Sequence, residues 1–336
     1  MAEGGGLLNR YRVVKPYRGF ESLRLRQCTS GGRGNGCHGH PVTSPVPKHP
    51  SFPSVNPGQQ RPAGAQVLER AALALRMGRF AEAEQLAADV LRASRTDAAA
   101  VSLLARALIA QNRGAEAIMP LEKAARRSSD PGIETLLGAA LGGAGRRAEA
   151  VEQLRRTTAR RPPFMPAFQE LAGQLAKDGS FGEAIVVIES GLALAPQSIE
   201  LQLDLARLHL HRNERGKARA ILSMARDAAP GRPEILTELA RVLLLDGEYP
   251  AAAEAYRQVL AHRPDDAMTR ADLAACLLEM GERDAGEANL RSALRSQPQM
   301  LGRATFALVH SSHGRFFFRK SAVARFLHGE TNKSTP

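Results

Sequence analysis

The chain has 336 residues, a formal net charge of +12 and no tryptophan. Its abundant alanine and leucine favour helices, because strands need more β-branched and aromatic side chains. The excess charge lies in the flanks: residues 1–65 sum to +7, residues 300–336 to +5 and the body between them to zero. A body without net charge does not attract phosphate, so we expect no nucleic-acid partner.

The first segment, residues 1–63, shows no helical period and becomes rich in Gly, Pro and Ser after Ser30. This composition predicts disorder. Cys28 and Cys37, with the nearby His38 and His40, lack the paired spacing of a zinc site. We therefore expect no metal and no cofactor here, and read these residues as part of a loop.

Residues 1–27 have a second interpretation. The run from Gly19 to Ser22 is what the T-arm of a transfer RNA gene encodes in one reading frame, and the run from Leu23 to Gln27 fits its acceptor stem. The segment therefore resembles a translated transfer RNA gene upstream of the true start, the alternative being an ordinary basic arm. We expect a cytoplasmic protein, with an export signal left open because the start is uncertain.

A repeat begins near Gly64 and continues to Met300. Its turn positions follow one another at intervals of 34 residues, with one interval of 33: Gly78, Asn112, Gly145, Gly179, Asn213, Gly247 and Gly281. A turn between antiparallel helices needs positive φ, which Gly and Asn tolerate. A small residue follows five positions later, where we expect two helices to cross: Ala83, Ala117, Ala150, Ala184, Ala218, Ala252 and Gly286.

Further repeated positions complete the pattern. Prolines that should end each second helix recur every 34 residues: Pro162, Pro196, Pro230, Pro264 and Pro298. In the first helices a leucine position, such as Leu137, is followed four residues later by another apolar residue, such as Leu141. This spacing is typical of a buried helical face.

This pattern resembles the tetratricopeptide repeat family, although the usual tryptophan near the start of each repeat is replaced, for example by Phe168 or Leu236. The resemblance implies an all-α, right-handed α-solenoid of about seven helix-turn-helix repeats. The predicted repeats are 64–97, 98–130, 131–164, 165–198, 199–232, 233–266 and 267–300.

Residues 301–336 should form capping helices and a short disordered tail. A last repeat exposes an apolar face, so we expect Phe317 and Phe326 to pack on the seventh repeat. The alternative is a basic, aromatic docking segment for a membrane surface or a partner. It would use Phe316, Phe317, Phe318, Arg319 and Lys320.

The chain carries no sequence motif of catalysis: no glycine-rich phosphate loop, no HExxH and no nucleophile elbow. We therefore expect no enzyme, no catalytic residue, no metal site and no cofactor. His209 and His211 lie two residues apart on a predicted helix and face different directions, so they do not share an ion. We expect His209 in the core and His211 toward the groove or solvent.

The resemblance implies a concave groove formed by the first helices. Its predicted lining is Arg106, Gln169, Glu170, Leu203, Asp204, Arg207, His211, Glu238, Arg241 and Leu244. Arg106, Arg207 and Arg241 hold equivalent places, where a guanidinium fork suits a carboxylate. The alternative is a solvated salt-bridge network without a ligand.

Three functions follow from this reading. The first is a non-enzymatic scaffold or adaptor that binds a segment of another protein, whose identity the sequence does not reveal. The second is an accessory or regulatory subunit of a separately encoded enzyme, such as a transferase of envelope polysaccharide synthesis. The third, which the neutral body disfavours, is an RNA-binding helical repeat.

Overall fold

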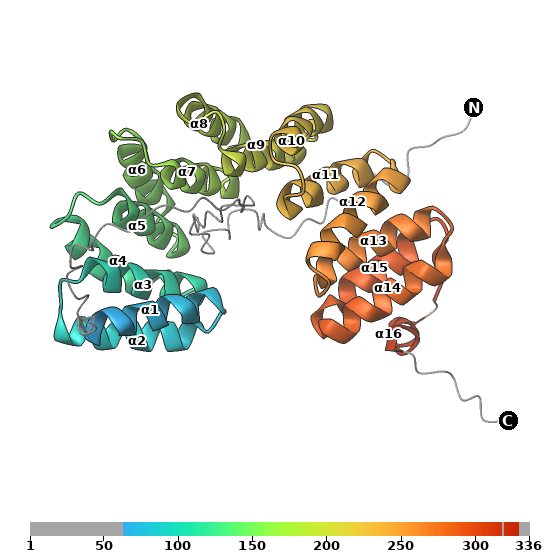
Figure 1. The fold of residues 1–336 in the computed structure, drawn as a ribbon, viewed down its shortest axis with the longest axis horizontal. Helices are drawn as coiled ribbons and strands as arrows, with labels where there is room; N and C mark the ends of the chain where they lie inside the picture. Colours follow the sequence, from blue (N-terminus) through green and yellow to red (C-terminus); the bar gives the residue numbers. More distant parts are fainter. Residues whose placement is uncertain (1–62, 318, 329–336) are drawn as a thin grey trace, which may run out of the picture. The chain divides into compact units, whose positions relative to one another are not determined.

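The protein is described by a computed structural model that covers residues 63–317 and 319–328. These residues form helices and connecting turns, without any strand among them (Figure 1). The segment 1–27, Cys28 to His40 and Phe318 lie outside this part of the chain. Within it, no helix is long and apolar enough to cross a membrane.

Fourteen of the helices form seven consecutive hairpins. The hairpins pair α1 (Ala63–Arg76) with α2 (Phe80–Ala93), α3 (Ala98–Ala110) with α4 (Gly114–Ala125), α5 (Pro131–Gly143) with α6 (Arg147–Thr158), α7 (Met165–Lys177) with α8 (Phe181–Leu194), α9 (Ile199–His211) with α10 (Arg215–Ala228), α11 (Pro233–Leu245) with α12 (Tyr249–His262), and α13 (Ala267–Glu279) with α14 (Arg283–Ser296). A 3-10 turn, η2 (Pro298–Met300), then leads to α15 (Leu301–His310) and α16 (Lys320–His328).

All seven hairpins have the same backbone turn. Each turn residue, from Gly78 to Gly281, has φ between 60° and 82°, including the two asparagines. The next residue donates its backbone N–H to the carbonyl five positions earlier in the first helix, over 2.8–2.9 Å, as Arg79 does to Ala74. This is a Schellman motif, which satisfies the last carbonyls of one helix and starts the next.

The first helices often begin with a side-chain cap, whereas the second helices do not. Asp97 accepts a hydrogen bond from the backbone of Ala100 at 2.9 Å, and Asp130 accepts one from Gly132 at 2.7 Å. Ser198 and Asp266 cap α9 and α13 in the same way. A carboxylate or hydroxyl at this position satisfies one of the free amides at a helix start. Side chains therefore cap the start of four first helices, whereas backbone hydrogen bonds close the turn within every hairpin.

Small residues fill the places where the two helices of a hairpin cross. Ala83, Ala184 and Ala252 have no exposed surface, and neither have their alanine counterparts in the other repeats. At Gly286 an added Cβ would lie 2.8 Å from Cγ of Leu278, so this crossing leaves no room even for alanine. Tight approach of the helices at this point requires these small side chains.

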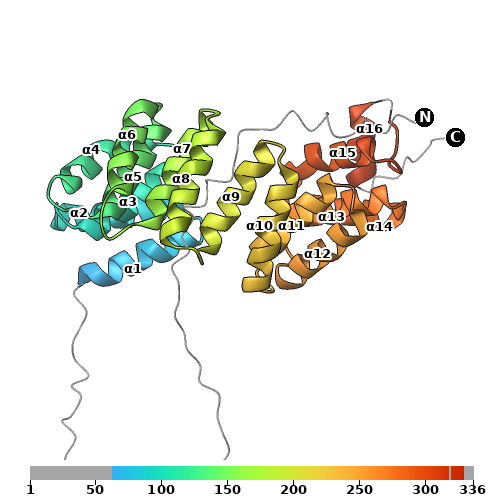
Figure 2. The same ribbon diagram turned by 90° about the horizontal axis from the view of Figure 1, so that it is seen from above.

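The chain divides into two compact units at residues 170 and 171, within α7. In the N-terminal unit, described from residue 63, side chains such as Leu108, Leu121 and Ile133 form the main core between α3, α4 and α5. In the C-terminal unit, a core around Leu222 and Tyr256 joins α9 to α13. The hairpins of each unit can be followed in a second view (Figure 2). Each core is continuous from one hairpin to the next.

The C-terminal unit ends in a helix that packs on the last hairpin. Val323 and Leu327 of α16 are 3% and 2% exposed and belong to one cluster with Leu290 and Leu308. Phe317 and Phe326, whose ring centroids are 5.5 Å apart, are partly buried against the same cluster.

Polar contacts fasten this C-terminal segment. The guanidinium carbons of Arg291 and Arg315 lie 4.6 and 4.9 Å from the centroid of the Phe326 ring. Both arginines also pair with Glu287, which is 3% exposed. Phe316, in contrast, is 79% exposed. Helix α16 therefore covers the apolar end of the last hairpin, while the Phe316 ring remains at the surface.

Candidate functional site

The predicted groove residues of the C-terminal unit form an ion-pair network on α9 and α11. Arg207 donates from Nε to Glu238 Oε1 at 2.6 Å and from Nη1 to Asp204 Oδ1 at 3.1 Å. Asp204 is 1% exposed and Glu238 9%, so both carboxylates are buried. Arg241 approaches the second oxygen of Glu238 at 3.9 Å, and half of its side chain is exposed. The buried acids hold Arg207 in place, and Arg241 offers a charge to the surface.

The other predicted groove residues of this unit lie close to its core. Leu203 is 5% exposed and Leu244 is partly buried, and both pack in the core cluster of α9 to α13. His209 is also buried, with Nδ1 2.7 Å from Glu214 Oε2. His211 is half-buried and stacks on Phe181, with ring centroids 5.4 Å apart and planes 7° apart. Repeat-to-repeat packing therefore uses the leucines, while the charged residues and His211 remain nearer the surface.

The environment of His211 disfavours its protonation. Burial and the nearby guanidinium of Arg241 hold the pKa of His211 below its ordinary value of 6.5, although Glu238 opposes them. A histidine whose pKa is lower in the folded than in the unfolded chain takes up a proton more readily when unfolded. Acidification therefore favours the unfolded chain. The free energy of unfolding should therefore fall as pH decreases through about 6.5, where the unfolded chain takes up the proton first.

We expect His211→Gln to flatten this pH dependence. Urea denaturation of the wild type and the variant at about pH 7.5 and about pH 5.5 would measure it. His209→Gln is the control, because His209 lies two residues away on the same helix and faces a carboxylate instead of Arg241. An equal loss of stability on acidification in the wild type and in His211→Gln would contradict the prediction.

The predicted lining of the groove omitted one equivalent position. Glu170, Asp204, Glu238 and Asp272 follow one another at intervals of 34 residues, and this spacing is the signal that could have revealed Asp272. Arg303 of α15 pairs with Asp272, so this acid also has an arginine partner. The first helices therefore present an acidic position in four consecutive repeats.

The predicted groove residues of the N-terminal unit are Arg106, Gln169 and Glu170. Gln169 is half-buried, and Glu170 is 5% exposed. Arg106 is half-buried on α3, and its Nε atom is buried without a hydrogen-bond partner. Burial lowers the pKa of Arg106, and the nearby carboxylate of Asp130 acts in the opposite direction. Arg106 thus differs from Arg207, which holds the equivalent position three repeats later and binds two carboxylates.

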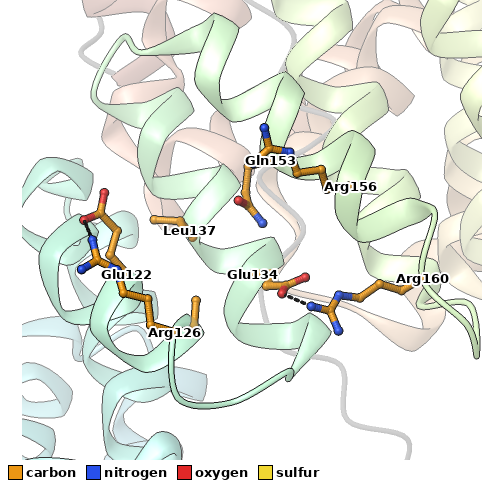
Figure 3. A pocket seen from close by; sticks show the side chains of 8 residues that line it. Glu122, Arg126, Glu134, Leu137, Gln153, Arg156 and Arg160 are labelled. Carbon is orange, nitrogen blue, oxygen red and sulfur yellow. Dashed lines mark hydrogen bonds and ion pairs between the residues drawn. The ribbon is translucent and has the colours of Figure 1, made fainter.

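A shallow hollow of about 520 Å³ lies elsewhere in the N-terminal unit, between α4, α5 and α6 (Figure 3). Its lining is Glu122, Ala125, Arg126, Glu134, Leu137, Gln153, Arg156 and Arg160. Each of its arginines already has a carboxylate partner: Glu122 for Arg126, Glu152 for Arg156 and Glu134 for Arg160. These charges are satisfied within the protein, so the hollow has no group that calls for a ligand.

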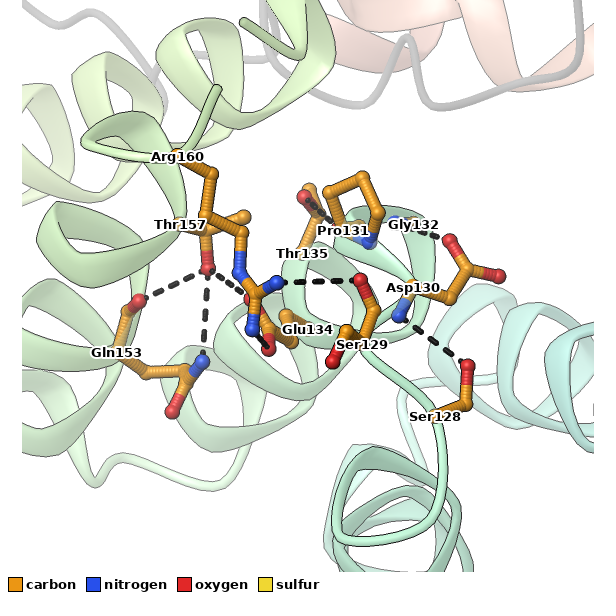
Figure 4. A network of polar contacts seen from close by, with 10 residues as sticks. All are labelled: Ser128, Ser129, Asp130, Pro131, Gly132, Glu134, Thr135, Gln153, Thr157 and Arg160. Carbon is orange, nitrogen blue, oxygen red and sulfur yellow. Dashed lines mark hydrogen bonds and ion pairs between the residues drawn. The ribbon is translucent and has the colours of Figure 1, made fainter. Parts of the chain in front are cut away.

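The contacts beside this hollow have a structural role. Arg160 pairs with the buried Glu134 and donates to the carbonyl of Ser129 at 3.2 Å (Figure 4). The Thr157 hydroxyl lies 3.3 Å from Glu134 Oε2 and 3.0 Å from the carbonyl of Gln153, and its one proton is shared between these two acceptors. These bonds join the end of α6 to the start of α5. Among residues 63–317 and 319–328, no group of three His, Cys, Asp or Glu side chains is placed to hold a metal ion.

Comparisons with known proteins agree with the helical-hairpin architecture. The crystal structure of the APC/C hetero-tetramer Cut9–Hcn1 superposes with a TM-score of 0.55 at 15% identity, over 80% of this chain and 54% of that one. A thermophilic tetratricopeptide repeat protein of Thermus thermophilus has a TM-score of 0.42 at 23% identity, over 64% of this chain and 100% of that one. At 15% identity the likeness to Cut9–Hcn1 concerns the fold alone.

A curated relative matches a shorter stretch. Over 112 residues the chain is 34% identical to the cellulose synthase operon protein C of Pseudomonas fluorescens (strain SBW25). The match covers 33% of this chain and only 9% of that protein.

The sequence profiles of the tetratricopeptide repeat family cover most of the array. One matches residues 74–127, 175–242 and 243–304, and a second matches residues 135–199. Together with the seven hairpins and their common turn, these matches show that the chain belongs to the tetratricopeptide repeat family.

Proposed function

We propose that the protein is a non-enzymatic scaffold that binds a segment of another protein on the first-helix face of its repeats. Tetratricopeptide repeats support protein binding, and solenoids of this kind offer extended surfaces for it. The observation that carries the proposal is the network of Asp204, Arg207, Glu238 and Arg241. It places buried charges where the fold could be completed with apolar side chains.

We take this network as a sign of binding because burying charged groups costs free energy. An ion pair in a protein interior often stabilises no more than packed apolar residues would, so such a pair is weak support for a purely stabilising role. Here the buried acids orient Arg207 and leave Arg241 half exposed. A fixed row of charges gives specificity for a partner of complementary charge pattern. We therefore place the partner on α9 and α11.

Site-specific photo-cross-linking in cells of the native host would test this. A benzophenone amino acid placed at Arg241 should form adducts with a discrete partner protein. The same amino acid at Met224 is the control, because Met224 of α10 is 71% exposed but lies on a second helix. Equal adducts at both positions, or none at Arg241, would contradict the proposed face.

A second candidate function is an accessory subunit of a separately encoded enzyme of polysaccharide synthesis. The similarity to a cellulose synthase operon protein favours it, over the 112 matched residues. Under this proposal the adduct at Arg241 would identify a subunit of such an enzyme. Mass spectrometry of the cross-linked band distinguishes this partner from an unrelated protein.

A further inference from the structure

Arg106 is a half-buried cation without an acceptor. Its Nε atom is buried and makes no hydrogen bond, and no ion pair of its guanidinium occurs within residues 63–317 and 319–328. Asp130 is the nearby negative charge, but its Oδ1 accepts the backbone N–H of Gly132 at 2.7 Å as the cap of α5. A guanidinium has five donors in a planar fork, and leaving the buried Nε–H of Arg106 unpaired is costly. Arg106 therefore lacks a negatively charged group to pair with in the described part of the chain.

The equivalent arginines in the C-terminal unit both have a carboxylate beside them. Arg207 binds two carboxylates and Arg241 lies near one. The difference arises from the acidic position of each first helix, which is Asp204 in α9 and Glu238 in α11 but Leu103 in α3 and Leu136 in α5. The α5 residue in the place of Arg106 is Ala139. Arg106 therefore stands on a face whose equivalent positions are apolar and uncharged.

The apolar neighbours limit what the missing partner can be. Leu103 precedes Arg106 by one helical turn on the same face and is half-buried, while Leu136 and Ala139 of α5 are 4% and 6% exposed. One cation among aliphatic side chains suits a peptide that carries a carboxylate between apolar residues. A nucleic acid would instead need several unpaired cations in a row.

We propose that Arg106 binds a glutamate or aspartate side chain of the partner, within a segment that is otherwise aliphatic. This rests on the proposed scaffold function and names the chemistry of the bound segment. The carboxylate would accept two hydrogen bonds from the guanidinium fork of Arg106 and neutralise a cation that is half-buried. In the N-terminal unit the single Arg106 would then bind the carboxylate, whereas on α9 and α11 Arg207 is held by its own carboxylates and the half-exposed Arg241 offers the charge.

The first test uses the stability of the whole chain without any ligand. Arg106→Met removes an unpaired charge and keeps an unbranched apolar stem that reaches about as far as Nε, so the variant should melt at or above the temperature of the wild type. Arg207→Met is the matched control at an equivalent repeat position, and it should melt several degrees lower because it strands Asp204 and Glu238. Equal destabilisation by both substitutions would overturn the proposal, since Arg106 would then have an acceptor within the protein.

The second test measures binding with defined probes. Fluorescein-labelled nonapeptides of Leu, Ala and Ser, each with two Glu residues, are compared with the same pool carrying Gln in place of Glu. The wild-type chain should retain the Glu pool about tenfold more tightly, as expected for a hydrogen bond between charged groups. Arg106→Met should lose the preference, and Arg106→Lys should keep part of it.

Arg92→Met is the control in the same unit, because Arg92 of α2 is highly exposed and pairs with Asp89. It should leave the preference for the Glu pool unchanged. Equal binding of the Glu and Gln pools by the wild type, or a preference that survives in Arg106→Met, would overturn the role of Arg106. Neither result would affect the cross-linking test at Arg241, so failure of this inference is distinguishable from failure of the scaffold function.

Discussion

Leu327→Ala should lower the free energy of unfolding by about 2–5 kcal/mol, the usual cost of removing a buried leucine side chain. Leu327 is 2% exposed and lies in α16 against Leu290 and Leu308. Its loss opens a cavity where the last hairpin is covered, and the end repeats of a solenoid depend on such covers. The variant should also self-associate through the uncovered apolar face. Chemical denaturation and size-exclusion chromatography would measure both effects.

Phe316→Ala is the matched control, because Phe316 is 79% exposed and its truncation removes little buried surface. It should leave both stability and oligomeric state unchanged. The same pair of variants tests the docking alternative for residues 316–320 with vesicles of anionic lipid. Loss of vesicle binding in Phe316→Ala, together with unchanged stability in Leu327→Ala, would show that this segment docks and does not cap.

Ala252→Leu should destabilise the protein by about 1–3 kcal/mol by overpacking a helix crossing. Ala252 of α12 has no exposed surface and belongs to the core cluster that contains Leu239 and Tyr256. A leucine there must displace backbone or core side chains, since interiors are close-packed. Thermal unfolding followed by circular dichroism would measure the loss.

Ala251→Leu provides the comparison, because the neighbouring Ala251 is exposed on the same helix turn. Both substitutions add the same atoms and change helix propensity equally, so only the crossing differs between them. Equal melting temperatures for the two variants would mean that position 252 tolerates bulk, and the packing account of the repeat would fail.

The fold could be predicted because the same local residue requirements recur in every repeat. Gly or Asn must occupy a turn with positive φ, and a residue as small as Gly286 must occupy a crossing with no space for a Cβ. These requirements are local, so a period of 34 residues makes them visible in the sequence. The family and the all-α fold predicted from them are confirmed.

The candidate site was less predictable, because the periodic positions indicate a face but not the pairing of charges. Arg207 pairs with Glu238 on the first helix of the next repeat, 31 residues later. The equivalent Arg106 is followed at the corresponding position by Leu136, which has no charge. Leu203 occupies a predicted groove position yet packs into the core. Such differences depend on side-chain neighbours from adjacent repeats, and the sequence of one repeat does not contain them.

The Schellman turns make the array suitable for labelling. Because backbone atoms close each turn, the residue after the positive-φ position is free to differ, and it is Arg in the first three hairpins, Ser in the fourth and Glu in the last three. Ser180 and Glu282 lie at two such turns within the C-terminal unit. Cysteine at these places would accept spin labels with little effect on folding. The distance between the two spin labels would then show whether the C-terminal unit lengthens or shortens when a partner binds.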